Sequence, residues 1–259
     1  MKIMKCKIRE LLFIALLLSL LAGCSAKTGT VHIETARIGA IADSIGYKYI
    51  EFNHPDAKLQ KYDSISDCIE ALQNGELDYV VTAYTTALYY IRINDGLEIL
   101  PDRLTDEGAA ITVAKNDVEL LSGISEVLDR FSSDGTLDGI ISNWIKEDGS
   151  AYVKTDIPVK QNGEILIVGV SANREPMCFV EDGIYIGLDC ELIERIAYEL
   201  GMKVEYEDMP FSELIDAMEG GRVDAVISNL FPSEERKERV SFTVEYFKNP
   251  QVFIKRSES

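Results

Sequence analysis

The stretch DGTLDGIISNWIKEDGS, residues 134–150, has the pattern of a chain terminus, although the chain continues to residue 259. Its apolar residues recur at helical spacing around the single tryptophan, and polar residues follow them. The next apolar segment, GEILIVGV at 163–170, is instead typical of the strand with which a domain begins. The inverted order of these two segments is the feature that the fold must explain.

The N-terminal residues resemble the leader of a bacterial lipoprotein. A basic segment, 1–9, precedes the apolar run LLFIALLLSLLA, 11–22, which is too short for a comfortable membrane span. Small residues then lead to Cys24, which predicts a signal peptide at 1–23, a lipid on Cys24 and a tether at 24–35. An ordinary secretory signal with a chance cysteine is the alternative. We expect an extracytoplasmic protein that its lipid anchors to the bacterial cell membrane.

The composition excludes several classes of partner. Acidic residues outnumber basic ones, 44 to 26, and the formal net charge is −18 at pH 7. This balance argues against nucleic acid and against docking on anionic lipid through a basic patch. The cysteines form no C-x-x-C motif and the only histidines are His32 and His54, so we expect no metal site and no cofactor. Cys178 could pair with Cys190 in an oxidising compartment, although buried free thiols are favoured.

Strand and helix signals alternate twice along the chain. Strands are expected at 36–42, 58–64 and 77–83, with helices between them, and the alternation begins again at 164 after a polar, linker-like stretch. ALQNGELDYVVT (71–82) and AMEGGRVDAVIS (217–228) share a helix, a glycine turn and a strand entered through aspartate. Such alternation predicts an α/β class with parallel-rich sheets.

Three long stretches resemble one known family, the bacterial extracellular solute-binding proteins of family 3. They are LIVGVSANREPMCFVEDGIYIGLDCELIERIAYELG (166–201), VEYEDMPFSELIDAMEGGRVDAVISNL (204–230) and SEERKERVSFTVEYF (233–247). Residues 36–145 are similar to the remainder of the same family, whose members are the polar amino-acid receptors of ABC importers. The resemblance implies an α/β, two-lobed, periplasmic-binding-protein-like fold of type 2, with a hinge between the lobes.

The segments of this family occur here in an inverted order. The usual chain runs through lobe one, then lobe two, and then returns to lobe one. Here the resemblance assigns 36–95 to the second lobe, 96–145 to the return segment, 146–163 to a linker joining the old termini, and 164–259 to the first lobe. A circular permutation explains the order, because permutation is tolerated where termini are exposed and close. The alternative is a truncated tandem receptor, and a folded monomer of residues 25–259 would decide for permutation.

The resemblance places a ligand between the lobes and an arginine on its α-carboxylate. That arginine is Arg236 here, and a planar guanidinium suits the task because it offers two parallel charge-assisted hydrogen bonds. Phe231 stands where the family usually has Thr or Ser, so it would contribute its N–H, line the pocket or pack in the core. Ser228 and Asn229 match a strand end that faces the ligand, and Phe211 matches an aromatic wall.

The ammonium side of the site departs from the family pattern. Ala83, which follows Thr82, occupies the position directly after the second lobe's last strand, where an aspartate is common. Ser171 replaces another acidic or polar group, and Arg174 stands at a commonly aromatic position. A buried ammonium without a carboxylate partner is costly. The site therefore favours an anion over a zwitterion.

The second lobe would contribute the start of a helix. Ser44 and Ile45 lie there, and the N–H groups of a helix N-terminus attract anions. Simple capping of the helix by Ser44 is an equally good interpretation.

The function expected from these features is capture of a solute. A lipid-anchored, monomeric receptor would bind a small polar, amino-acid-like or anionic metabolite and deliver it to an ABC permease. A ligand-sensing or degenerate module that partners a membrane sensor is the alternative. Some dehydratases resemble this fold, but the sequence offers neither an evident acid–base pair nor a nucleophile with a nearby histidine, so we expect no enzyme.

Overall fold

The computed structural model describes residues 33–146 and 150–257. The expected signal peptide, the expected lipid site Cys24 and most of the expected tether therefore lie outside the described residues. Within the described part, no helix combines the length and the apolar character needed to cross a membrane.

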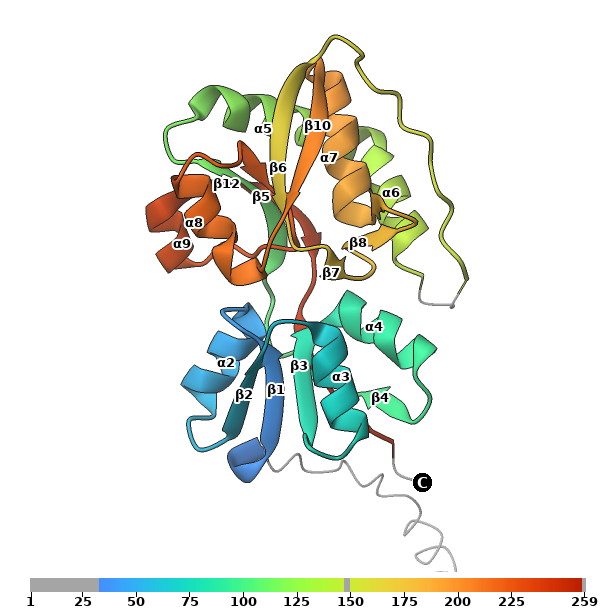
Figure 1. The fold of residues 1–259 in the computed structure, drawn as a ribbon, viewed down its shortest axis with the longest axis vertical. Helices are drawn as coiled ribbons and strands as arrows, with labels where there is room; N and C mark the ends of the chain where they lie inside the picture. Colours follow the sequence, from blue (N-terminus) through green and yellow to red (C-terminus); the bar gives the residue numbers. More distant parts are fainter. Residues whose placement is uncertain (1–32, 147–149, 258–259) are drawn as a thin grey trace, which may run out of the picture. The chain divides into compact units, whose positions relative to one another are not determined.

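Two five-stranded sheets form the frame of the protein (Figure 1). Sheet A has the strand order β2-β1-β3-β13-β4, and sheet B has the order β10-β6-β11-β5-β12. Sheet A consists of β1 (Arg37–Ile41), β2 (Lys58–Tyr62), β3 (Tyr79–Ala83), β4 (Leu97–Ile99) and β13 (Gln251–Arg256). Sheet B consists of β5 (Gly108–Ala114), β6 (Glu164–Val170), β10 (Met202–Asp208), β11 (Ala225–Val226) and β12 (Val240–Lys248). We call each sheet with its helices the A lobe and the B lobe.

The helices alternate with the strands, as the sequence predicts. The A lobe contains η1 (Ile33–Thr35), α2 (Ile45–Asn53), α3 (Ile65–Gln73) and α4 (Tyr84–Ile93). The B lobe contains α5 (Val118–Asp134), α6 (Thr136–Trp144), α7 (Leu188–Glu199), η2 (Phe211–Glu213), α8 (Leu214–Glu219) and α9 (Glu234–Arg239). It also holds a small sheet of β7 (Asn173–Arg174), β8 (Cys178–Glu181) and β9 (Ile184–Ile186). Local chemistry sets the ends: Ser64 Oγ accepts from the Asp67 N–H, and α5 stops at Gly135, which is left-handed with φ 83°.

The two sheets share one topology. In sheet A, β1 pairs in parallel with β2 and with β3, and β13 lies antiparallel between β3 and β4. In sheet B, β6 pairs in parallel with β10 and with β11, and β5 lies antiparallel between β11 and β12. The stretches 71–82 and 217–228, whose sequences are alike, thus occupy equivalent places. The expected α/β class with two lobes is confirmed.

The chain crosses twice between the lobes. The chain leaves sheet A after β4 and enters sheet B as β5, through residues 100–107. It leaves sheet B after β12 and enters sheet A as β13, through residues 249–250. These two crossings are visible in Figure 1 as the segments that connect the sheets. β5 and β13 each make backbone hydrogen bonds on both sides, and β13 completes the A lobe from a distant part of the chain.

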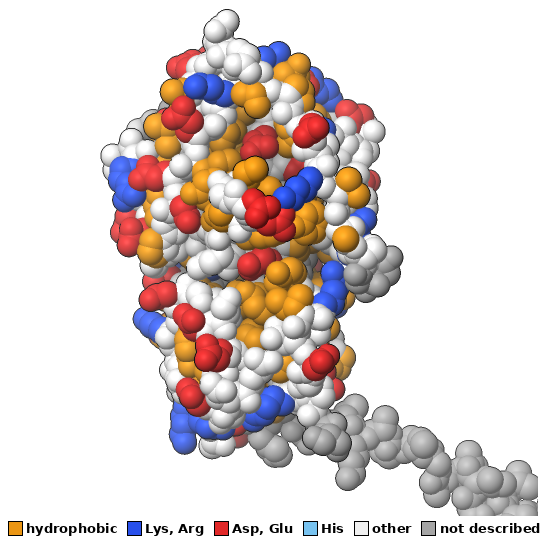
Figure 2. Space-filling view, turned by 45° about the vertical axis from the view of Figure 1, so that its right-hand side comes forward, with side chains coloured by type: hydrophobic (Ala, Val, Ile, Leu, Met, Phe, Trp, Pro, Cys, Tyr) orange, Lys and Arg blue, Asp and Glu red, His pale blue; other side chains and the backbone are white. Residues whose placement is uncertain are grey.

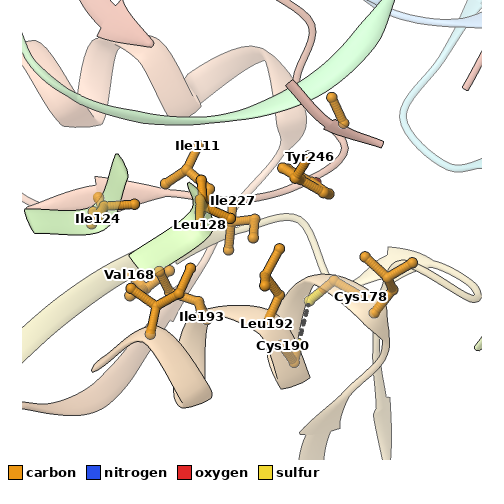
Figure 3. Close-up of a cluster of buried hydrophobic side chains, with 14 of the residues drawn as sticks. Ile111, Ile124, Leu128, Val168, Cys178, Cys190, Leu192, Ile193, Ile227 and Tyr246 are labelled. Atoms are coloured by element: carbon orange, nitrogen blue, oxygen red, sulfur yellow. Dashed lines mark hydrogen bonds between the residues drawn. The ribbon is translucent and has the colours of Figure 1, made fainter. Parts of the chain in front are cut away.

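Two clusters of buried apolar side chains form the hydrophobic core of the protein. The first lies between sheet B and its covering helices, and Figure 3 shows side chains of β5, α5, β6 and α7 meeting there. The second extends from α3 and β3 of the A lobe to Phe211 and Leu214 of the B lobe. Burial of this kind supplies the main favourable term in folding, at about 25 cal/mol per Å² of apolar surface.

The segment after α6 docks on the B lobe. Asn143 donates from Nδ2 to the Val153 carbonyl (2.8 Å) and accepts from the Val153 N–H (2.9 Å). Tyr152 stacks on Trp144 with a centroid separation of 4.5 Å, and the Trp144 Nε1–H donates to Glu191 (2.7 Å). The indole N–H of Trp144 is therefore hydrogen-bonded, and its ring is packed by a residue of the segment that follows α6.

The described cysteines are buried free thiols. Cys178 Sγ and Cys190 Sγ lie 3.2 Å apart in the core of the B lobe, as the dashed line in Figure 3 marks. Cys68 is buried in the A lobe, and burial raises the pKa of its thiol to about 12. The interpretation of buried free thiols agrees with this arrangement.

Charged side chains of both signs are intermixed on the face shown in Figure 2. Some of them form exposed ion pairs, such as Arg130 with Glu199 and Arg222 with Glu207. Pairs of this kind contribute less than about 1 kcal/mol each. The charges that bear on function are instead the buried ones.

Candidate functional site

Arg236 joins the two lobes. Its backbone N–H donates to Ser233 Oγ (3.2 Å), which caps α9 and fixes where the side chain begins. The guanidinium is buried and donates from Nη1 to the Phe231 carbonyl (2.9 Å). Its Nη2 donates to the Asp43 carbonyl of the A lobe (3.0 Å). Both acceptors are neutral, so the charge of Arg236 has no carboxylate partner within the described chain.

A second guanidinium, that of Arg174, lies against the same aromatic ring. Arg174 Cζ is 3.9 Å from the centroid of Phe211, and Arg236 Cζ is 5.4 Å from that centroid. The Nε and Nη2 atoms of Arg174 are buried and make no hydrogen bond to any described residue. Attraction to the face of Phe211 offsets part of their desolvation. The structure thus brings Arg174, Arg236 and Phe211 together.

Burial weakens the proton affinity of both arginines. Desolvation lowers the pKa of Arg236 to about 10 and that of Arg174 also to about 10. For Arg174 the positive charge of Arg236 acts in the same direction, and the carboxylate of Asp189 opposes it. Both side chains remain protonated at pH 7. Because Nε and Nη2 of Arg174 are buried and unpaired among the described residues, we expect the two guanidinium groups to attract an anion.

Asp189 organises the residues behind this site. Its carboxylate is fully buried and accepts from the Asn229 N–H (2.7 Å) and from the Tyr246 hydroxyl (2.6 Å). Asn229 has a left-handed backbone with φ 48°, and Asn249 donates from Nδ2 to its side-chain oxygen (3.1 Å). Asp189 therefore holds Asn229 in a conformation that few residues adopt.

The sequence analysis did not select Asp189 or Asn249. Asp189 lies in the first turn of a helix, where an acidic residue is common, and the sequence does not show that this one is buried.

Asp189 should make the free energy of unfolding decrease as pH rises from about 4 to about 7. Burial raises the pKa of its carboxyl from 3.8 to about 7, so over this window the folded protein keeps a proton that the unfolded chain has lost. The contribution to the slope approaches about 1.4 kcal/mol per pH unit. Asp189→Asn keeps an acceptor for the Asn229 N–H and should remove this contribution to the pH dependence. Urea unfolding at several pH values will measure the change.

Asp208→Asn is the matched control for this pH dependence. Asp208 also accepts a hydrogen bond from a backbone N–H, that of Ala172 (2.9 Å), but Asp208 is exposed. If the Asp189 variant and the Asp208 variant give the same pH dependence as the unchanged protein, the assignment to Asp189 is wrong.

The remaining B-lobe candidates lie in a bonded group. The Ser171 N–H donates to Ser228 Oγ (3.0 Å), and Ser171 Oγ donates to Asn173 Oδ1 (3.2 Å). Ser171, Ser228 and Asn229 are buried. The Phe231 side chain is also buried, while its carbonyl accepts from Arg236. Phe231 therefore contributes both packing and a backbone acceptor.

The A-lobe candidates are less directly connected to the arginines. Ser44 Oγ accepts from the Tyr47 N–H (3.1 Å), so Ser44 caps α2, of which Ile45 is the first residue. The connection to Arg236 is made by the preceding residue, Asp43, whose φ is 58°.

Thr82 and Ala83 are the last two residues of β3, and they pair with Val252 and Gln251 of β13. Because β4 follows later in the same sheet, β3 is not the last strand of this lobe, contrary to the expectation.

A separate pocket of about 300 Å³ lies between α4 and the segment after α6. Tyr89, Trp144, Tyr152 and Phe179 are among its lining residues. None of the predicted ligand residues lines this pocket. Within the described residues, no group of three or more His, Cys, Asp or Glu side chains is arranged to hold a metal ion.

Two α/β lobes, with buried basic side chains where they meet, define a two-lobed α/β protein. Residues 166–259 match the model of the bacterial extracellular solute-binding proteins, family 3, so the resemblance seen in the sequence is confirmed for this part of the chain. The family consists of solute-binding receptors rather than enzymes.

Named relatives match a similar length of the chain. The arginine-binding extracellular protein ArtP of Bacillus subtilis is 34% identical over 94 residues, which are 36% of this chain and 37% of ArtP. The glutamate-binding protein GluB of Corynebacterium glutamicum is 32% identical over 110 residues, 40% of this chain and 37% of GluB. The chain thus spans just over a third of the length of these relatives. Among solved structures, a ligand-binding component of an ABC-type import system from Staphylococcus aureus is 15% identical, with a TM-score of 0.46, over 87% of this chain and 67% of that one.

Proposed function

We propose that this protein is an extracytoplasmic receptor that captures a small polar, amino-acid-like or anionic metabolite for an ABC importer. A lipid on Cys24 would hold it at the membrane. The observation that carries the proposal is the buried Arg236 guanidinium, which reaches from one lobe to the other and has only neutral acceptors. Membership of residues 166–259 in a solute-binding family supports the same conclusion.

The proposed mechanism is closure of the lobes around the ligand. A carboxylate would enter beside Arg236 and accept two charge-assisted hydrogen bonds, in place of the neutral carbonyls of Phe231 and Asp43. The crossings at 100–107 and 249–250 would serve as the hinge, because these segments connect the sheets. The ion pair of Lys48 in the A lobe with Glu235 in the B lobe would re-form on each closure.

The proposed domain order is that of a circular permutant. The A lobe, the return through β5 to α6, the linker and the first-lobe segment together supply each strand of the shared topology once. The linker runs from α6 to β6, both of which belong to the B lobe. A join within one lobe is what closure of two neighbouring old termini requires. The truncated tandem receptor is the competing explanation.

Thermal unfolding of the protein against a panel of solutes tests the proposed function. The panel contains amino acids, dicarboxylates, keto acids and small peptides. A ligand present at about 100 times its dissociation constant adds about 2.7 kcal/mol to the free energy of unfolding, which raises the melting temperature measurably. We expect one chemical class to do so. A cooperative transition that no class shifts would contradict the receptor function.

A further inference from the structure

The face of Phe211 is already occupied by a side chain of the protein itself. Arg174 Cζ lies 3.9 Å from the ring centroid, which is the separation of direct contact between a guanidinium and an aromatic face. A ligand ring or a ligand guanidinium could not stack on that face without displacing Arg174. A ligand beside this face would therefore be held by its charged ends rather than by stacking on it.

The positive charge of the site is not balanced by the protein. Neither Arg174 nor Arg236 has a carboxylate oxygen within 4.0 Å among the described residues. The one buried carboxylate that acts on Arg174, that of Asp189, already accepts from Asn229 and Tyr246. Asp43 and Glu235 act on Arg236 from exposed positions, and Glu235 is paired with Lys48.

Among the described residues, the ammonium of an amino acid would find no carboxylate at the positions where one would be expected. The two positions at which an acid would be expected are Ala83 and Ser171. Ser171 is buried, and its hydroxyl already donates to Asn173. An ammonium beside these two guanidinium groups would add a third positive charge and would be disfavoured by repulsion and by its own desolvation.

The unpaired atoms of Arg174 have the geometry that a carboxylate requires. Nε and Nη2 lie on the same edge of the guanidinium, and their N–H bonds are parallel. Both atoms are buried and without a partner in the described chain. This edge is the fork that binds the two oxygens of one carboxylate.

We propose that the site binds a short dicarboxylate without an ammonium group, with one carboxylate on Arg236 and the other on the Nε–Nη2 edge of Arg174. The inference rests on the proposed function. A short ligand suffices, because both guanidinium carbons lie within 5.4 Å of one ring centroid. Two carboxylates balance two guanidinium charges, so the closed site becomes neutral.

The test uses the full-length chain in detergent, with affinities measured by titration calorimetry. Succinate and glutarate represent the proposed class, glutamate and alanine carry an ammonium, butyrate has one carboxylate, and sulfate is a compact dianion. Succinate or glutarate should bind at least tenfold more tightly than every other probe. Arg174→Gln should weaken dicarboxylate binding at least tenfold and leave butyrate binding unchanged. Arg222→Gln, which removes an exposed ion pair, should change neither.

Each other result overturns the inference in a distinguishable way. Tighter binding of glutamate or alanine than of dicarboxylates overturns it and leaves the receptor function intact, and so does sulfate binding as tightly as succinate. Unchanged dicarboxylate affinity in Arg174→Gln removes Arg174 from the site. Binding of none of the probes, together with no response to the wider panel, overturns both proposals. Arg174→Lys keeps the charge but loses the fork, so it should also weaken dicarboxylate binding if Arg174→Gln fails to fold.

Discussion

Arg236→Ala is expected to abolish ligand binding while the protein remains folded. The side chain is buried and supplies the fork at the junction of the lobes, so its truncation leaves a ligand carboxylate desolvated and unpaired. Removing one partner of a buried, hydrogen-bonded charge pair costs about 2–5 kcal/mol, which corresponds to an affinity loss of about 30-fold or more. Titration calorimetry with the compound that raises the melting temperature will measure the loss.

The fold should tolerate this change because the guanidinium costs stability when no ligand is bound. Burial lowers its pKa to about 10, which shows that the site disfavours the charged form. Arg239→Ala is the control on the same helix, since Arg239 forms exposed ion pairs with Asp216 and Glu219. It should leave affinity unchanged. Retention of full affinity by Arg236→Ala would mean that the ligand lies elsewhere.

Gly187→Ala is expected to cause the largest loss of stability of any change considered. Gly187 has φ 130°, a conformation that residues with a side chain rarely adopt. An added Cβ would also lie within 2.6 Å of the Met177 carbonyl carbon. The Met177 carbonyl cannot move away freely, because it accepts a hydrogen bond from the N–H of Asp189 (2.9 Å), which lies in the first turn of α7. We expect a loss of about 3 kcal/mol or more and a lower melting temperature by about 10 °C.

Gly183→Ala separates the two causes of this loss. Gly183 has φ 79° and nothing lies within 4 Å of an added Cβ, so only the backbone conformation is strained. Its loss should be about 1 kcal/mol. If thermal unfolding gives equal losses of stability for the two variants, the contact with Met177 does not contribute to the loss caused by Gly187→Ala.

Local patterns in the sequence were sufficient to predict most of the individual elements. The strand expected at 77–83 is β3 (Tyr79–Ala83), and the helix expected before it is α3. Periodicity and caps succeed there because they are properties of neighbouring residues. The insertion of β13 between β3 and β4 had no such signal. That pairing joins residues far apart in the chain, and its register follows from packing of the whole lobe.

The candidate site was predicted only in part, because contacts between residues far apart in the chain have no local signal. Arg236, Phe211 and Arg174 were selected by resemblance, and the structure places them together. The stacking of Arg174 on Phe211 could not be read from spacing, since the two residues come from different elements. The capping role of Ser44 was one of two interpretations, and its Oγ does accept from the Tyr47 N–H. The roles of these residues toward a ligand stay predictions.

The late position of β13 (Gln251–Arg256) in the chain constrains the order in which the protein can be assembled during synthesis. Sheet A lacks the strand between β3 and β4 until β13 has left the ribosome, long after β4 has emerged. Until then, β3 and β4 present unpaired edges to other nascent chains. The A lobe, although it is encoded first, is therefore the part of the protein that becomes complete last.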